Sequence, residues 1–270
     1  MAGDEQIEAA GERAAHDRVS ERELRSADDL LRPHNEHWTT IPIIVYRAIF
    51  RMSGLDHYWL YQVPVITAHL ACAGMLWVVL RRARLHPWIV TAVGILLLFL
   101  GSGRANLAWG FQISFTGAVA FGLAHLLLAD RDGPWGRRDL LALGFGAAAL
   151  MFSGIGVVMV VVVASAVLIR RGWKLAALHT APLLVIYALW YLTYGQPEES
   201  VGAPTPRQAL GFIRWTVWDS FLGMGQHALV AVGLGALGAV GVVAAGPAFT
   251  PGERARPAAT ARGAWGGAAP

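Results

Sequence analysis

Charged residues are scarce in this sequence. Asp, Glu, Lys and Arg make up 15% of its 270 residues, whereas hydrophobic residues make up 55% and the mean hydropathy is +0.47. A typical soluble domain carries about 25% charged residues, which keep its surface in water. The composition therefore excludes an ordinary soluble protein and indicates an integral membrane protein.

Cysteine is almost absent, since Cys72 is the single one and lies inside an apolar run. One cysteine can form neither an intramolecular disulfide nor a cysteine-based metal site. The N-terminal region also lacks the short apolar core and small-residue cleavage site of a secretory signal peptide. The net charge of +4 does not indicate nucleic acid as a partner, because the basic residues stand in short clusters between apolar runs.

Long apolar runs are the main feature that is present. Four of them contain no Lys, Arg, Asp or Glu: 59–80, 107–128, 175–194 and 226–246. Each is close to the roughly 20 residues that a helix needs to cross a bilayer. Shorter apolar segments occupy 88–103, 139–152 and 154–169, and Ser153 with Gly154 separates the last two. The sequence predicts an all-α, polytopic membrane bundle of about seven transmembrane segments.

The composition changes along the chain and predicts four zones. Residues 1–27 form a polar tail typical of disorder, and 247–270 form a second disordered tail rich in Ala, Gly and Pro. Residues 28–58 comprise a loop and an amphipathic helix that lies along the membrane surface, with Arg47 and Arg51 on its polar face. Residues 59–246 form the transmembrane domain.

Basic clusters predict the orientation, because cytoplasmic loops are enriched in Lys and Arg. With seven segments, all the clusters fall on one side of the membrane: 81–84, 131–138, 170–174 and 254–262. The prediction is a multi-pass protein of the cell membrane with residues 28–58 on the external face. Something must then carry the polar tail across the membrane, so the chain is expected to lack its natural first transmembrane helix.

A dense group of ionisable residues precedes the surface helix, with the sequence DDLLRPHNEHW from Asp28 to Trp38. His34 and His37 are three residues apart and would share a divalent metal ion on one helical turn, but the spacing specifies no further ligand. The alternative is a helix start that Asn35 caps and Trp38 anchors at the headgroup level. The residues alone leave both interpretations open.

A second candidate site is the short external loop with Arg104 and Asn106, followed by Gln112 one turn into the next helix. An arginine at this place would hold a lipid phosphate. Alternatively, Arg104 only extends to the interface and Trp109 anchors the helix.

The order of these features resembles the polytopic membrane glycosyltransferases of the GT-C fold, in particular uncharacterised actinobacterial integral membrane proteins of that type. The resemblance covers roughly residues 28–195. It rests on the acidic pair, on LLRPHNEHW, on the surface helix IPIIVYRAIF, on a transmembrane helix that ends in RR, and on LLLFLGSGRANLAWGFQISF at 96–115.

The resemblance implies that a sugar passes from a polyprenyl-phosphate donor in the membrane lipid to an acceptor at the external face, by an inverting displacement. An acidic residue of the first external loop acts as the base, which by position is Asp28 or Asp29. In the family, the acidic pair directly follows a first transmembrane helix, whereas Asp28 and Asp29 follow a polar tail. Glu36 is therefore an equal candidate for the base. The substrate-binding candidates are His34, Asn35, His37, Arg104, Asn106 and Gln112.

Four histidines lie inside apolar runs: His69, His125, His179 and His227. Intramembrane ionisable residues are often functional. These four fall on different segments with no Asp or Glu within the runs, so they are predicted to serve packing. The alternative function is a non-catalytic multi-pass protein, such as a transporter component or an assembly partner, although the chain shows no internal repeat.

Overall fold

The computed structural model describes residues 27–98, 107–195, 205–225 and 227–245. The described part of the chain is helical, apart from turns and one isolated bridge between His34 and His37. It divides into two compact units, residues 1–201 and 202–270. The all-α prediction is confirmed. Both predicted tails, apart from Ala27, and the loop with Arg104 and Asn106 lie outside the described residues.

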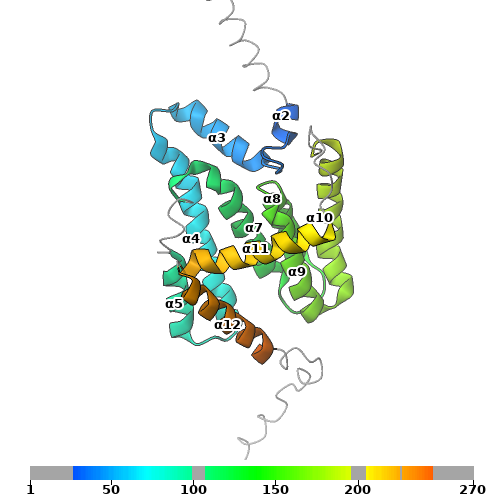
Figure 1. The fold of residues 1–270 in the computed structure, drawn as a ribbon. Coiled ribbons are helices and arrows are strands. Elements are labelled where there is room, and N and C mark those ends of the chain that lie inside the picture. The colour runs from blue at the N-terminus through cyan, green and yellow to red at the C-terminus, as the bar shows by residue number, and fades with distance from the viewer. Residues whose placement is uncertain (1–26, 99–106, 196–204, 226, 246–270) are drawn as a thin grey trace, which may run out of the picture. The chain divides into compact units, whose positions relative to one another are not determined.

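The first unit contains most of the helices (Figure 1). In chain order its elements are α2 (Ala27–Leu31), α3 (Thr40–Ser53), α4 (Tyr58–Arg82), α5 (Pro87–Leu98), the 3-10 turn η2 (Gly110–Gln112), α7 (Ile113–Ala129), α8 (Arg137–Leu150), α9 (Ile155–Arg171) and α10 (Trp173–Thr193). The second unit contains α11 (Pro206–Gly225) and α12 (Ala228–Ala245).

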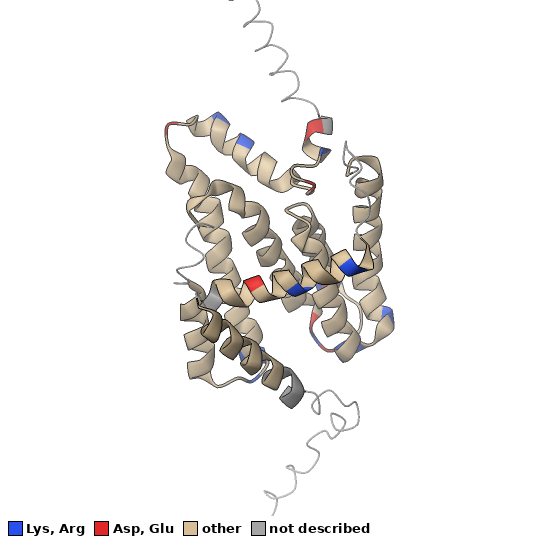
Figure 2. Ribbon diagram, viewed as in Figure 1, with Lys and Arg blue, Asp and Glu red and all other residues tan. Residues whose placement is uncertain are grey.

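Among the described residues, three helices are long and apolar enough to cross a membrane: α4 with 25 residues, η2 and α7 together with 20, and α10 with 21. In Figure 2, α4 and α10 carry Lys or Arg only at one end, and η2 and α7 carry no Lys, Arg, Asp or Glu. The pair α11 and α12, bent by 111°, would add a fourth span. The predicted number of about seven is not confirmed. Helices α5, α8 and α9 have 12, 14 and 17 residues, fewer than the roughly 20 that a bilayer requires.

The predicted break near Ser153 separates α8, which ends at Leu150, from α9, which begins at Ile155. Gly156 makes this break possible. A Cβ atom at that position would lie 2.5 Å from the carbonyl oxygen of Ala149, so only glycine lets the two helix ends approach so closely.

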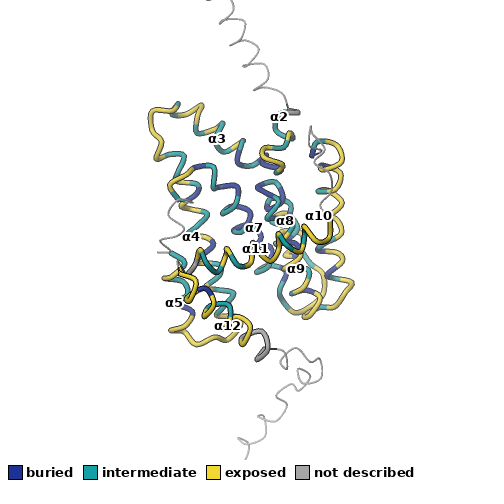
Figure 3. The backbone as a smooth tube through the Cα atoms, in the orientation of Figure 1, coloured by how far each residue is buried: buried dark blue, intermediate teal, exposed yellow. Residues whose placement is uncertain are grey.

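Helix α7 lies at the centre of the unit and packs against α4, α8 and α9. Buried residues concentrate on α7, on α8 and in the turn before α3, whereas much of α5 and α10 is exposed (Figure 3). The exposed residues of α10 include Leu184, Val185, Leu189 and Leu192. Exposed apolar area of this extent indicates contact with lipid or another protein.

The predicted amphipathic helix is α3, and some of its apolar residues contact the bundle. Ile41, Val45 and Tyr46 pack against a buried cluster of the bundle, as an apolar face should. Ile44 and Met52 are 49% and 87% exposed, as apolar residues of a helix that faces lipid would be.

Candidate functional site

Residues 34–37 form a tight turn. The backbone N–H of His34 donates to the carbonyl of His37 and the N–H of His37 donates to the carbonyl of His34, each over 3.0 Å. Asn35 and Glu36 have φ values of 47° and 64°, in the left-handed region that such a two-residue turn requires. The expected helical turn is wrong, and so is the cap at Asn35. Helix α3 begins later, after Thr39, which makes no capping hydrogen bond with its side chain.

The turn directs the two imidazoles into different surroundings. His34 is exposed and lines a cavity beside α3. His37 is half-buried and meets the edge of Phe115, with ring centroids 6.0 Å apart. Among the described residues, no group of three or more His, Cys, Asp or Glu side chains could hold a metal ion. These residues do not fit the divalent metal, and we derive no step through one.

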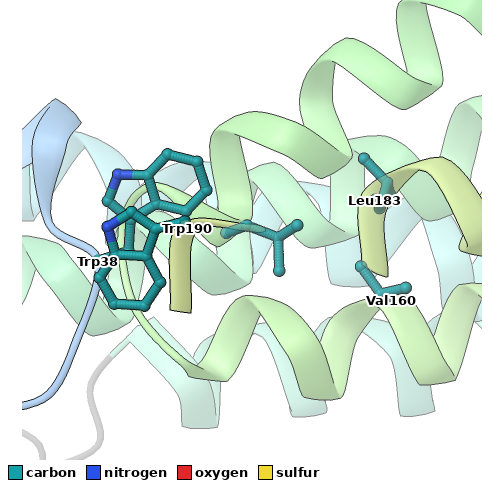
Figure 4. Close-up of a cluster of buried hydrophobic side chains, with 5 residues drawn as sticks. Trp38, Val160, Leu183 and Trp190 are labelled. Carbon is teal, nitrogen blue, oxygen red and sulfur yellow. The ribbon is translucent and has the colours of Figure 1, made fainter. Parts of the chain in front are cut away.

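Trp38 anchors this segment to the bundle. Its indole stacks on Trp190 of α10, with centroids 5.3 Å apart and planes inclined by 3° (Figure 4). The Nε1 atom of Trp38 donates to Thr40 over 2.7 Å, and Nε1 of Trp190 donates to the carbonyl of Leu31 over 2.7 Å. Both ends of the segment are therefore fixed by buried aromatic side chains.

The cavity beside α3 has a volume of about 640 Å³. Much of its wall is apolar, including Pro42, Ile43, Phe50, Leu55 and Phe111. Its polar lining includes His34, Tyr46, Arg47 and Arg51. A hydrophobic wall with two guanidinium groups can hold an amphiphile that carries a negative charge.

The three candidate carboxylates are placed differently. Asp29 forms an ion pair with Arg47, so it lies at the edge of the cavity. Glu36 is exposed in the turn and does not line the cavity. The side chain of Asp28 lies outside the described residues. No carboxylate is among the described residues that line the cavity.

Tyr46 connects the cavity to the segment before α7. Its hydroxyl donates to the carbonyl of Gly110. Burial is the main cause that raises the pKa of Tyr46 above its ordinary range, and the nearby Tyr58 adds to the effect. The hydroxyl of Tyr46 therefore keeps its proton and acts as a hydrogen-bond donor. Gln112, a predicted binding residue, is half-buried in η2 and does not line the cavity, and its carbonyl accepts a hydrogen bond from Thr116. Asn35, another predicted binding residue, is exposed.

A second cluster surrounds the fully buried Asp139 in the first turn of α8. Its Oδ1 accepts hydrogen bonds from Arg171 over 2.5 Å and from Nε2 of His179 over 3.0 Å. Its Oδ2 accepts from Arg131 over 2.5 Å and from the N–H of Gly136 over 2.8 Å. Two guanidinium groups and two further donors satisfy the buried carboxylate, which would otherwise be very costly to bury.

This cluster gives two histidines an acidic partner that the sequence interpretation did not identify. Nε2 of His125 lies 3.2 Å from Nδ1 of His179, so residues on α7 and α10 form one chain with Asp139. The sequence placed these histidines on separate helices without an acidic partner. The partner was missed because Asp139 stands at the boundary of an apolar segment and 40 residues before His179. Its position between a basic loop and an apolar run was the only available signal.

Comparison of the chain with protein-family models, curated proteins and solved structures gives no match. The fold and composition define the class: the part of the chain that the structure describes is all-helical and contains three helices long and apolar enough to span a membrane, or four if the bent pair is one span.

Proposed function

We propose that this protein is a glycosyltransferase-like membrane protein that holds the phosphate of a polyprenyl-linked sugar donor in the cavity beside α3. The observation that carries the proposal is the combination of Arg47 and Arg51 with an apolar wall in one cavity of about 640 Å³. A polyprenyl phosphate requires both features, because its chain must stay out of water and its phosphate needs a cationic partner.

In the proposed reaction, the hydroxyl oxygen of the acceptor forms a bond to the anomeric carbon of the sugar. The bond from that carbon to the phosphate oxygen breaks, and the lipid phosphate departs with the electron pair. The hydroxyl proton passes to a carboxylate, and the arginines stabilise the charge that develops on the phosphate. We assign the base to Asp29, with Asp28 and Glu36 as the other candidates, because Asp29 contacts Arg47 at the edge of the cavity.

The proposal includes a multi-pass position in the cell membrane with residues 28–58 on the external face. In this arrangement α5, α8 and α9 complete about seven segments as short or tilted helices. Support comes from the basic residues, which concentrate at the ends of helices and in the turns where α4 meets α5, α7 meets α8 and α9 meets α10. Arg104 and Asn106, which lie outside the described residues, are further candidates for contacts to the donor, whereas Gln112 does not line the cavity.

A non-catalytic role is the second candidate. The arrangement of Asp29 favours it, because the side chain is engaged with Arg47 and no described cavity-lining residue carries a carboxylate. A protein of this kind would bind a lipid phosphate as a transporter component or an assembly partner without transferring its sugar.

The binding part is tested with the purified full chain and two probes, a polyprenyl phosphate and the uncharged polyprenol of the same length. Native mass spectrometry should show preferential retention of the phosphate. Arg51→Gln should reduce this retention about tenfold, because Arg51 has no carboxylate partner among the described residues and a charge-assisted contact contributes about 1.5–3 kcal/mol. Arg214→Gln is the matched control. Equal retention of both probes would refute the proposed site.

The transfer part is tested in membranes that contain the protein and labelled polyprenyl-phosphate sugars. Asp29→Asn should abolish transfer while the lipid phosphate remains bound. If only Asp28→Asn or Glu36→Gln abolishes it, the base is reassigned to that residue. Binding without transfer by the unmodified protein would favour the non-catalytic alternative.

A further inference from the structure

The basic residues around the start of α8 and α10 fall into two groups. The first group serves the fold: Arg131 and Arg171 bind Asp139, and Arg170 lies 3.0 Å from Asp130. The second group is Arg137, Arg138 and Lys174. These three side chains are exposed and have no carboxylate partner in the described part of the chain.

The exposed cations lie at one end of the bundle, although they belong to two helices. Asp139, two residues after Arg137, is hydrogen-bonded to His179 of α10 over 3.0 Å. Arg171, three residues before Lys174, donates to the carbonyl of Gly133 over 3.2 Å. The buried carboxylate therefore holds the loop before α8 against the loop before α10.

Two tryptophans accompany these cations. Trp173 is 68% exposed, and Nζ of Lys174 lies 5.8 Å from the centre of its ring. Trp135 is 37% exposed, and its ring centroid lies 5.5 Å from that of His179. Exposed tryptophan beside Lys and Arg, at the end of an apolar helix, is typical of the headgroup level of a membrane.

The fold itself does not need the three exposed charges. Arg137, Arg138 and Lys174 stand in the first turns of α8 and α10, where a positive charge opposes the helix dipole. Because they stabilise neither helix and bind no carboxylate among the described residues, their charge is available to a partner outside the chain.

The opposite end of α8 lies beside α3. The N–H of Ile41 donates to the carbonyl of Met151, directly after α8. With 14 residues, α8 separates the two ends by roughly 20 Å. The exposed cations are thus distinct from the cavity with Arg47 and Arg51.

We propose that Arg137, Arg138, Trp173 and Lys174 form a basic surface that binds the phosphates of anionic phospholipids. The lipids belong to the headgroup layer at this end of the bundle. Their net negative charge complements three exposed cations that have no carboxylate partner among the described residues, and each Lys or Arg near an anionic surface adds about fivefold to the affinity. A zwitterionic lipid lacks this net charge.

The experiment uses the purified full chain in neutral detergent, with phosphatidylglycerol and phosphatidylcholine as probes. Native mass spectrometry should show at least about tenfold stronger retention of phosphatidylglycerol, weakening with added salt. The triple variant Arg137→Gln, Arg138→Gln, Lys174→Gln should lose that preference. The charge-preserving variant Arg137→Lys, Arg138→Lys, Lys174→Arg should keep it.

The double variant Arg207→Gln, Arg214→Gln is the control, since both residues are exposed and belong to the other unit. It should retain the preference. Equal retention of phosphatidylglycerol by the unmodified chain and the triple glutamine variant would overturn the proposal, as would an equal loss in the control variant. The basic surface and the lipid-phosphate cavity are tested by different variants, so either proposal can fail alone.

Discussion

Trp38 and Trp190 stack in parallel, 152 residues apart in sequence, with ring centroids separated by 5.3 Å. Both indoles are buried, at 7% and 4% exposure. The stack fixes the turn with His34 to α10, and through it the start of α3 and the wall of the cavity. The position of residues 34–38 therefore depends both on the local reverse turn and on the long-range contact between Trp38 and Trp190.

Trp38→Ala should lower the unfolding free energy by about 3–5 kcal/mol, because it removes the stack and leaves a void in the buried cluster. Trp38→Phe keeps an aromatic ring but loses the hydrogen bond to Thr40 over 2.7 Å. The loss of this hydrogen bond should lower the unfolding free energy by about 1 kcal/mol, in addition to the effect of the smaller ring. Thermal unfolding in detergent measures both. Similar unfolding temperatures for the alanine variant and the unmodified protein would show that the stack does not support the fold.

Asp139→Asn should be among the most destabilising single substitutions, by about 3–5 kcal/mol, since it leaves Arg171 buried without a counter-charge. The matched control is Asp130→Asn, whose partner Arg170 is 43% exposed, and it should change stability by about 1 kcal/mol or less. Chemical unfolding of the three proteins in one detergent distinguishes the pairs. If both variants lose the same stability, burial of the ion pair is not the decisive property.

Gly156→Ala should destabilise the protein by about 1–3 kcal/mol, because its Cβ would lie 2.5 Å from the carbonyl oxygen of Ala149. Gly144 provides the control, since a Cβ there meets no atom within 4 Å. Gly144→Ala should leave stability unchanged or raise it by about 0.5–1 kcal/mol. Unfolding temperatures test the contrast, and a harmless Gly156→Ala would disprove the close approach of α8 and α9.

The predicted sidedness is testable with single cysteines in a Cys72→Ser background. A cysteine in place of the exposed Arg32 should react with a membrane-impermeant thiol reagent in intact cells. A cysteine in place of the exposed Asp132 should react only after lysis, because its loop belongs to the basic side. The reverse labelling pattern would contradict the external position of residues 28–58.

The length of the apolar runs was sufficient to locate α4, α7 and α10. In an apolar environment the backbone N–H and C=O groups must form hydrogen bonds within the helix, so the helix extends to the residues where the sequence becomes polar. The pair α8 and α9 was also predictable, since glycine and serine mark the break. Run length could not determine how many helices cross the membrane, because α8 and α9, with 14 and 17 residues, are shorter than the roughly 20 residues that a bilayer requires.

Residues 34–38 show the limit of local interpretation. Spacing of three indicates one helical turn, but the stack of Trp38 on Trp190 and the backbone bonds between His34 and His37 hold a reverse turn instead. Tertiary contacts of this kind override local propensity, and the sequence pattern contains no signal for them.

The sequence by itself determined the helical class, the apolar segments and the positions of the basic clusters, because these depend only on the polarity and length of continuous stretches. Only the tertiary structure decided which distant side chains meet: Asp29 with Arg47, Trp38 with Trp190, and Asp139 with His179. The physical reason is that each pair joins separate segments, and their contact depends on the packing of whole helices rather than on the residues beside them in the chain.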